Sequence, residues 1–453
     1  MTRQRAIRDR TFASLKRHYN YRLFFAGQVF SLSGTWMQSV AMYWLVLQLT
    51  HSAFAVGVLS LSRFAPSMIF APFAGTLADR LDNRLTLVWT QAAQMVVAAG
   101  LAVLALTGNI EAWMIDLAAV LAGTVLCLDS PARQGLTFEM VGRDELPNAV
   151  ALNSTLFNAA RVAGPALGGT LIAAFGSGWC FAANAGSFLA VLAALLLMRA
   201  DELFPLERRH PPRLLAGTRE GLAFARSQPL IAASLTLITV YASLLFNVDV
   251  LLPLLANQTL HRGAGTFALF TAAFGFGAFS GALGVAARGA SRWSTTVVSA
   301  IGLAVVYLAI VPLTSVPMIA VLLAVGGVMF TTLTANVNTR LQLETPDWLR
   351  GRVLSLYLYS WNALAPLGAL LIAWLCSVGS ARLAFGVVAV AGLATVGVVQ
   401  WRLPRDSRRE RGLGRAEPLF DEPPLTSGLG FPAIPSLQEE GADGSRRPRP
   451  RRR

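Results

Sequence analysis

The sequence predicts an all-α membrane protein of twelve transmembrane helices, built as two six-helix bundles with both termini in the cytoplasm. Three observations support this fold class. The 453-residue chain is 54% apolar and only 14% charged, whereas a soluble protein carries about a quarter charged residues. Its apolar residues form twelve runs of spanning length, and a span needs roughly 20 residues. Six runs lie on each side of one long basic loop.

The apolar runs follow one another along almost the whole chain. Several contain Gly and Pro, which membrane spans tolerate where neighbouring helices satisfy the backbone. The predicted spans are 23–48, 53–77, 85–107, 112–130, 148–175, 179–198, 229–256, 264–287, 293–313, 316–338, 352–378 and 381–401. We divide the chain into a basic N-terminus (1–21), a first bundle (22–198), a linker (199–228), a second bundle (229–401) and a disordered basic tail (402–453).

The distribution of basic residues predicts the orientation. With a cytoplasmic N-terminus, Arg262 and Arg382 lie outside and Arg63 and Arg161 lie within spans, which leaves 34 of the 38 Lys and Arg residues on the cytoplasmic side. An excess of basic residues in cytoplasmic loops is the usual determinant of topology. We therefore attribute the net charge of +14 to membrane orientation and expect no nucleic-acid partner. The arginine-rich end, 446–453, suits acidic lipid headgroups.

The linker and the reactive residue types indicate no enzyme chemistry. Residues 214–226 predict a short amphipathic helix at the membrane surface. The three cysteines fall inside apolar runs without metal-type spacing, and the four histidines do not cluster. No Gly-x-x-x-x-Gly-Lys-Ser/Thr phosphate loop is present. We expect neither an enzyme nor ATP-driven transport by this chain alone, and neither a cofactor nor a metal.

The two halves of the chain repeat each other. Polar residues and a proline lie at helical spacing on one face of span five and, 201 residues later, on one face of span eleven. The two sets are Ser154, Asn158, Arg161 and Pro165, and Ser355, Tyr359, Asn362 and Pro366. Together with the six spans on each side, the repeat indicates a duplicated transporter bundle.

The loop between spans two and three has a specific pattern. It contains Gly75, Asp79, Arg80, Asp82 and Arg84. A glycine allows close packing at the end of the span, and a carboxylate at the membrane boundary can face the positive N-terminal end of another helix. A contact of this kind, present in one conformation and broken in another, acts as a conformational latch. The alternative is an ordinary basic loop with a compensating acid.

This pattern resembles the loop signature of the major facilitator superfamily, Gly-x-x-x-Asp-Arg-x-Gly-Arg-Arg, with Asp82 in place of the usual Gly. The variant, with the stretches 129–134, 145–153 and 346–355, is similar to the branch of drug and siderophore exporters that includes the enterobactin exporter and the macrolide efflux proteins. The resemblance covers about residues 20–401. It implies the major facilitator fold and alternating access by rocking of two bundles. It also implies that Asp79 faces the start of span eleven, near Arg350 and Arg352.

A second pattern lies in span five, where Gly164, Pro165, Gly168 and Gly169 follow one another closely. Small residues let helices approach, and a proline removes one backbone hydrogen bond. The run resembles the core of a motif that marks exporters in the superfamily, although the glycines expected upstream are absent. Plain helix packing is the alternative interpretation.

Ionisable residues within spans are costly and are usually functional. Arg161, near the middle of span five, could bind an anionic substrate group or pair with a carboxylate. Asp249 in span seven is our first candidate for proton coupling, with a residue wetted at the outer mouth as the alternative. Asp116, at the outer end of span four, is a second candidate, or a partner for Arg63. Span four has no Arg before Gly123, so a coupling scheme that needs one does not apply.

Polar residues also form stripes on two other spans. Such stripes line a wet cavity or hydrogen-bond neighbouring helices. With Asn158, Arg161 and Asn362, the predicted cavity residues are Gln28, Ser31, Thr35 and Gln38 of span one and Thr334 and Asn338 of span ten.

These observations lead to one functional prediction and two rivals. We predict a proton-coupled secondary exporter of a small amphipathic molecule, such as a siderophore or a macrolide-like drug, in the bacterial inner membrane. Its partners are that substrate, protons and membrane lipids, and a monomer is the working expectation. One rival is a lipid or lysolipid flippase, or an importer, of the same fold. The other is a non-transporting receptor or scaffold.

Overall fold

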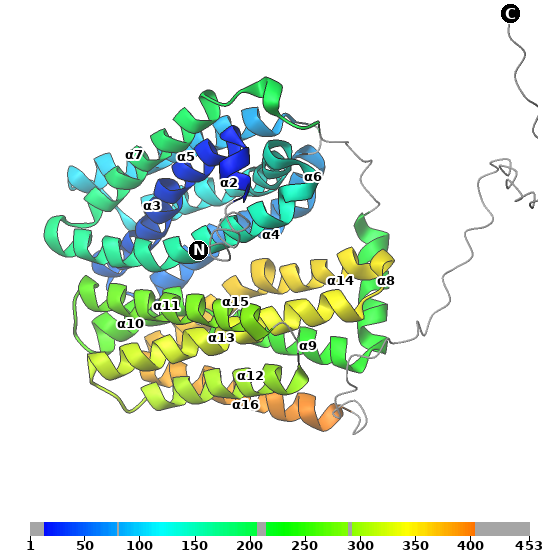
Figure 1. Ribbon diagram of the computed structural model, residues 1–453. Helices are drawn as coiled ribbons and strands as arrows, with labels where there is room; N and C mark the ends of the chain where they lie inside the picture. The colour runs from blue at the N-terminus through cyan, green and yellow to red at the C-terminus, as the bar shows by residue number, and fades with distance from the viewer. Residues whose placement is uncertain (1–12, 79–80, 206–213, 289–291, 404–453) are drawn as a thin grey trace, which may run out of the picture. The chain divides into compact units, whose positions relative to one another are not determined.

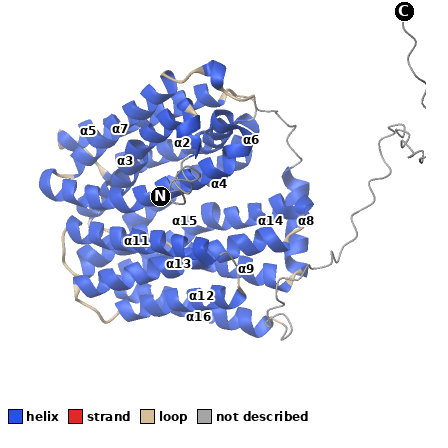
Figure 2. Ribbon diagram, in the orientation of Figure 1, coloured by secondary structure: helices blue, strands red, loops and turns tan. Residues whose placement is uncertain are grey.

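A computed structural model describes residues 13–78, 81–205, 214–288 and 292–403, and these residues contain helices but no strands (Figures 1 and 2). The described residues belong to one compact unit, and the predicted tail beyond Leu403 lies outside them. The first half contains α2 (Ala13–Arg17), α3 (Tyr19–Thr50), α4 (Ala53–Ala78), α5 (Asn83–Leu106), α6 (Ala112–Phe175), α7 (Ser177–Leu196) and η1 (Ala200–Glu202). The second half contains α8 (Leu214–Ser227), α9 (Pro229–Val240), η2 (Tyr241–Leu245), α10 (Val248–Leu254), η3 (Leu255–Thr259), α11 (Ala264–Arg288), α12 (Trp293–Ile310), α13 (Val316–Glu344), α14 (Asp347–Tyr359), η4 (Ser360–Leu364), α15 (Ala365–Val378) and α16 (Ala381–Arg402).

Each predicted span lies on a helix or on a run of joined helices. In the described part of the chain, nine helices are long and apolar enough to cross a membrane. The longest, α6, contains two predicted spans, 112–130 and 148–175. The all-helical membrane class is therefore confirmed, and the number of twelve crossings stays a prediction.

Local backbone chemistry sets the breaks between the helices. α3 ends where His51 adopts a left-handed conformation and its N–H donates to the carbonyl of Leu47. The carboxylate of Asp82 accepts from the N–H of Leu85 at 2.7 Å and so caps the start of α5. Inside α6, Gly142 has φ 70°, which interrupts the helix between its two predicted spans. These breaks reverse the chain between successive spans.

Small residues allow close packing within each half. Gly27 and Gly34 of α3 lie against α7, where an added Cβ would meet the backbone of Val191 or the side chain of Asn184. In the second half, Gly277 of α11 and Gly327 of α13 each lie against the backbone of the other helix. Figure 1 shows α3 to α7 grouped together and α9 to α16 grouped together. Close approach of this kind is what membrane helices use in place of a hydrophobic driving force.

Contacts between the two halves use the same device. Gly169 of α6 packs against Ala268 of α11, and Gly57 of α4 packs against Ala373 of α15. Trp44 of α3 stacks on Phe267 of α11, with ring centroids 6.2 Å apart. The other residues of the span-five pattern have different partners: Gly164 and Gly168 lie against Trp36 and Met37 of α3, and Pro165 is buried.

Two π-helical turns, η2 and η4, interrupt the segments 229–259 and 347–378 of the second half. They lie close together: Thr239, two residues before η2, and Ser360 of η4 share a hydrogen bond of 2.8 Å between their hydroxyls. Gly368, four residues beyond η4, lies against the carbonyl of Ser243 in η2. Turns of this type are rare and often occur at functional sites.

The helix α8 coincides with the predicted linker helix. Its Glu220 forms an ion pair with Arg352 of α14, and its Gly221 lies against the backbone of Arg352. The linker is thereby attached to the start of the segment 347–378. The basic stretch 208–212 before it lies outside the described residues.

Candidate functional site

The guanidinium of Arg161 lies among aromatic rings that come from both halves. It is 5.6 Å from the ring centroid of Trp36 and 5.3 Å from that of Phe246. Phe274 and Phe330 follow at 5.7 and 5.8 Å. Four separate segments therefore bring a ring to one arginine near the middle of the predicted span 148–175 of α6. We call Arg161 and these four rings the arginine box.

Three rings of the box also contact one another, and two of them contact a fifth ring, Trp361 of η4. Phe246 stacks on Phe330 with centroids 4.5 Å apart, and Trp361 meets Phe246 edge-on at 4.6 Å. Phe274 lies 5.7 Å from Phe330. Each aromatic pair stabilises the arrangement by about 0.5–1.5 kcal/mol beyond its buried area. The rings thus form a joined wall and do not depend on the arginine for their order.

The rings stabilise the arginine only in part. A charge at mid-bilayer costs about 3 kcal/mol on insertion scales. Four cation–π contacts of about 0.5–1 kcal/mol each offset most of that cost. They satisfy none of the five N–H donors of the guanidinium, and no hydrogen bond or ion pair of Arg161 is found among the described residues. The residue as a whole is half-buried, and its N–H groups keep their capacity to donate to a ligand.

Asp249 is a carboxylate that interacts electrostatically with Arg161. It lies in the first turn of α10, is half-buried, and makes no hydrogen bond or ion pair with another described residue. The buried Tyr43 also lies within reach of the charge of Asp249. Asp249 of the second half therefore faces two polar residues of the first half.

Arg63 and Asp116 do not pair with each other, in contrast to one expectation from the sequence. The guanidinium of Arg63 donates to the hydroxyl of Ser39, and the Asp116 carboxylate interacts with Ser62. One carboxylate oxygen of Asp116 is buried and has no partner among the described residues. Hydroxyls of two helices take the place of this pairing: Ser39 of α3 accepts from Arg63, and Ser62 of α4 lies beside Asp116.

The polar stripe on span one is mostly turned toward other helices. Gln28, Ser31 and Gln38 are buried, and Asn184 of α7 donates to the Gln38 side chain at 2.7 Å. Thr35 alone of the four is exposed, and its hydroxyl donates to the carbonyl of Ser31. Most of this stripe hydrogen-bonds or packs within the first half, which leaves Thr35 as its open position.

The other predicted cavity residues are less buried. Thr334 and Asn338 of α13 and Asn158 of α6 are half-buried. Asn158 donates to the carbonyl of Ser154, one turn earlier in its own helix. Asn362 follows Trp361 in η4, and its side chain lies outside the described residues. Thr334 and Asn338 share α13 with Phe330, and Asn158 shares α6 with Arg161.

The predicted latch is described only in part. Gly75 lies in α4, and Asp79 and Arg80 lie outside the described residues. Arg84 donates to the carbonyls of Leu195 and Leu196 at the end of α7, at 2.8 and 3.1 Å. Arg350 donates to the carbonyl of Gln342 near the end of α13. Both arginines therefore cap the ends of helices in their own half, where a positive charge offsets the helix dipole.

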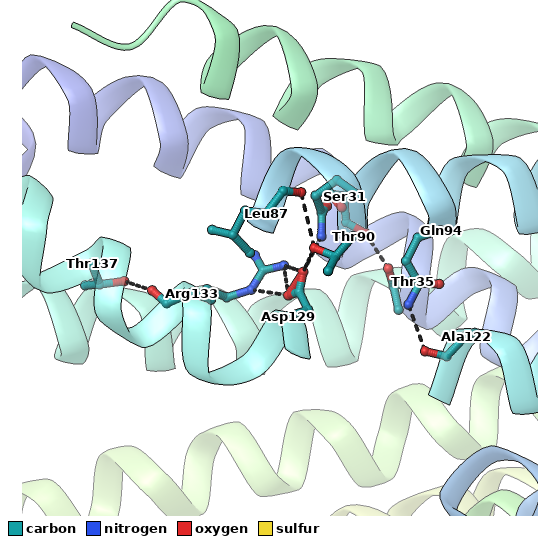
Figure 3. A network of polar contacts seen from close by, with 10 residues as sticks. Ser31, Thr35, Leu87, Thr90, Gln94, Ala122, Asp129, Arg133 and Thr137 are labelled. Atoms are coloured by element: carbon teal, nitrogen blue, oxygen red, sulfur yellow. Dashed lines mark hydrogen bonds and ion pairs between the residues drawn. The ribbon is translucent and has the colours of Figure 1, made fainter. Parts of the chain in front are cut away.

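A buried ion pair in the first half was missed by sequence reasoning (Figure 3). Arg133 donates to the carboxylate of Asp129, one turn earlier in α6, with a shortest distance of 2.6 Å. Thr90 and Gln91 of α5 donate to the same carboxylate at 3.0 and 2.6 Å. Asp129 is 2% exposed and Arg133 is partly exposed, so the carboxylate is removed from water and the guanidinium only in part. The spacing of four residues between an acid and an arginine was the available signal.

The sequence matches the model of the transmembrane secretion effector family over residues 10–427. It is 29% identical to the multidrug efflux pump Tap of Mycolicibacterium fortuitum, over 82% of this chain and 93% of that protein. It is 28% identical to the enterobactin exporter EntS of Citrobacter koseri, over 91% and 97% of the two chains. The staphyloferrin A transporter of Staphylococcus aureus is 26% identical, over 83% and 93%.

Solved transporter structures share the fold. A POT family transporter in complex with 5-aminolevulinic acid superposes with a TM-score of 0.66 at 10% identity, over 85% of this chain and 96% of that one. A bacterial homolog of the human lysosomal transporter Spinster gives 0.63 at 12% identity, over 84% and 94%. At this identity the likeness concerns the fold alone.

Proposed function

Because the chain belongs to the transmembrane secretion effector family of the major facilitator superfamily, we propose that it is a proton-driven exporter of small amphipathic molecules. Membership in this family makes it a secondary transporter in the inner membrane, and not an enzyme. The direction of transport, the proton and the class of cargo are the proposal. It includes twelve spans with both termini in the cytoplasm.

The arginine box is the observation that carries the proposal. It joins an unpaired cation at mid-span to apolar rings, which is the combination that an amphipathic molecule needs: apolar walls and a few placed polar groups. Trp36 and Arg161 come from the first half, and Phe246, Phe274 and Phe330 come from the second. A cargo held there touches both halves, as alternating access between two bundles requires.

Asp249 is the proposed proton carrier. An aspartate without a hydrogen bond or ion pair among the described residues can gain a proton without breaking a contact. Protonation removes its attraction for Arg161 across the halves. The proton thereby changes the free-energy difference between the conformations in which the halves approach or part at this point. Asp116 is the second candidate, and the loop from Gly75 to Arg84 remains the proposed latch.

The test is accumulation of fluorescent amphipaths, ethidium and 1-pyrenesulfonate, in everted membrane vesicles under an imposed pH gradient. We expect the full chain to accumulate at least one of them. Asp249→Asn should reduce gradient-driven accumulation by about tenfold or more, since it removes the titrating group. Asp201→Asn, an exposed change of the same kind in η1, is the matched control and should accumulate normally.

Each outcome bears on one part of the proposal. If the wild-type chain accumulates neither probe in response to the gradient, export driven by protons is wrong. If Asp249→Asn accumulates the probe as the wild type does, Asp249 does not carry the proton, and the same measurement on Asp116→Asn follows.

A further inference from the structure

The arginine box has an unusual composition for a binding site, because its cation belongs to the protein. Cages of aromatic rings commonly bind ligand cations. Here the guanidinium of Arg161 already lies over four rings, at 5.3 to 5.8 Å from their centroids. A cationic ligand would face both an occupied cage and a like charge. The box therefore disfavours cations despite its rings.

The donors of Arg161 define the group that fits. A guanidinium presents its N–H groups as a planar fork, which matches the two oxygens of a carboxylate, sulfonate or phosphate. No described residue accepts a hydrogen bond from Arg161, and the residue as a whole is half-buried. Asp249 acts on it electrostatically without forming an ion pair. An oxyanion of the cargo would thus give Arg161 a charge-assisted hydrogen bond that no described residue provides.

The adjoining wall defines the rest of the cargo. Phe246, Phe330 and Trp361 are joined ring to ring, with Phe246 at 4.5 and 4.6 Å from the other two. Phe246 and Trp361 remain half-buried, so part of their surface is free. Planar groups pack on such surfaces by offset stacking or edge contact. The wall and the fork are adjacent, because Phe246 contacts both.

We infer that the cargo is an anionic aromatic amphipath, whose acidic group is bound by the guanidinium of Arg161 and whose ring packs on the wall of Phe246, Phe330 and Trp361. This inference rests on the proposed export function, because the bound molecule is a transported substrate only if the protein is an exporter. Arg161 and Phe246 are its specificity-determining residues.

The test measures binding of three defined probes to the purified full chain by titration calorimetry. Naphthalene-2-sulfonate carries both features, 2-naphthyltrimethylammonium reverses the charge, and cyclohexanesulfonate removes the ring. We expect naphthalene-2-sulfonate to bind about tenfold or more tightly than either of the others. Equal or tighter binding of the cationic probe, or no detectable binding of naphthalene-2-sulfonate, overturns the inference.

Variants identify the residues. Arg161→Gln should weaken binding of naphthalene-2-sulfonate by about tenfold or more, and Arg161→Lys should recover part of the loss, since it restores the charge without the fork. Phe246→Leu should weaken the aromatic probe more than cyclohexanesulfonate. Arg262→Gln removes an exposed cation from a loop and is the matched control. Undiminished binding by Arg161→Gln contradicts the assignment, and if that variant does not fold, the Lys variant and the charge preference of the wild type decide.

The binding and vesicle experiments test the site and the export function separately. Selective binding of naphthalene-2-sulfonate without gradient-driven accumulation would leave the site intact and remove the export function. Accumulation of ethidium that is indifferent to Arg161→Gln, with no preference for the anionic probe in calorimetry, would keep export and remove the site.

Discussion

The contact between Gly169 and Ala268 yields a quantitative prediction about conformational change. A Cβ added at Gly169 would overlap the Cβ of Ala268 in the other half of the molecule. Neither group is the end of a flexible side chain, so relief requires that α6 and α11 move apart. We expect Gly169→Ala to shift the population away from the conformation described above and toward one in which these helix ends are separated.

The size of the shift follows from two opposing terms. Overpacking of a tight contact costs about 1–3 kcal/mol. Replacing Gly by Ala inside a helix also gains about 1 kcal/mol of helix propensity, but that gain is present in both conformations and cancels from their ratio. The remaining 1–3 kcal/mol changes the ratio of conformers by about 5- to 150-fold.

Spin labels at Asn109 and Arg262 measure the separation. Both positions are exposed loop residues, one from each half. Arg262 lies just before α11, and Leu106 at the end of α5 packs against Gly178 at the start of α7, which places the two loops near the ends of α6 and α11. In a background without native cysteines, the distance distribution should shift to longer values in Gly169→Ala.

The controls separate an overlap from a general effect of alanine. Gly100→Ala in α5 adds a Cβ that meets nothing within 4 Å, and it should leave the distribution unchanged. Adding Ala268→Gly to Gly169→Ala removes the overlapping atom and should restore it. An unchanged distribution in Gly169→Ala, or a shift that Ala268→Gly fails to reverse, would refute the reasoning.

The remaining predictions concern contacts that stabilise each half from within. Asp129→Ala should lower stability by about 3–5 kcal/mol, since it leaves the charge of Arg133 unpaired; melting of the purified protein measures this, and a similar loss for the double variant Asp129→Ala with Arg133→Leu would contradict it. Glu220→Gln should cost under about 1 kcal/mol, because its ion pair with Arg352 is exposed; a larger drop in the melting transition would show that α8 is held by this pair alone. Arg84→Ala removes two hydrogen bonds to carbonyls at the end of α7, each worth about 1 kcal/mol; hydrogen exchange should increase in the last turn of α7, and unchanged exchange there would exclude a capping role.

Much of the fold was predictable because it depends on local features of the sequence. Spanning helices need only apolar length, and each of the twelve predicted segments is helical. Arg161 was predicted as a site residue because a charge inside an apolar run is conspicuous in any sequence. The break at Gly142 was not predicted, since a glycine between two spans does not by itself specify a positive φ.

The aromatic part of the site was not predictable in the same way. Trp36, Phe246, Phe274 and Phe330 lie on four segments of two halves, and each is an ordinary apolar residue in an apolar run. Only the approach of α6 to the second half brings them to one guanidinium. The stripe on span one left two interpretations open for a related reason. Helical periodicity shows that Gln28 and Gln38 share a face but not whether that face meets water or α7.

The division of the arginine box between the halves has a mechanistic consequence. A ligand changes a conformational equilibrium only through a difference in its binding free energy between the two states. A cargo bound wholly by the first half would keep the same contacts when the halves move. Here the donor, Arg161, belongs to the first half, and the wall formed by Phe246, Phe330 and Trp361 belongs to the second. Under the proposed alternating access, rocking of the halves changes the distance between the guanidinium of Arg161 and the aromatic wall. The two contacts proposed to select the cargo would then also make its binding depend on conformation.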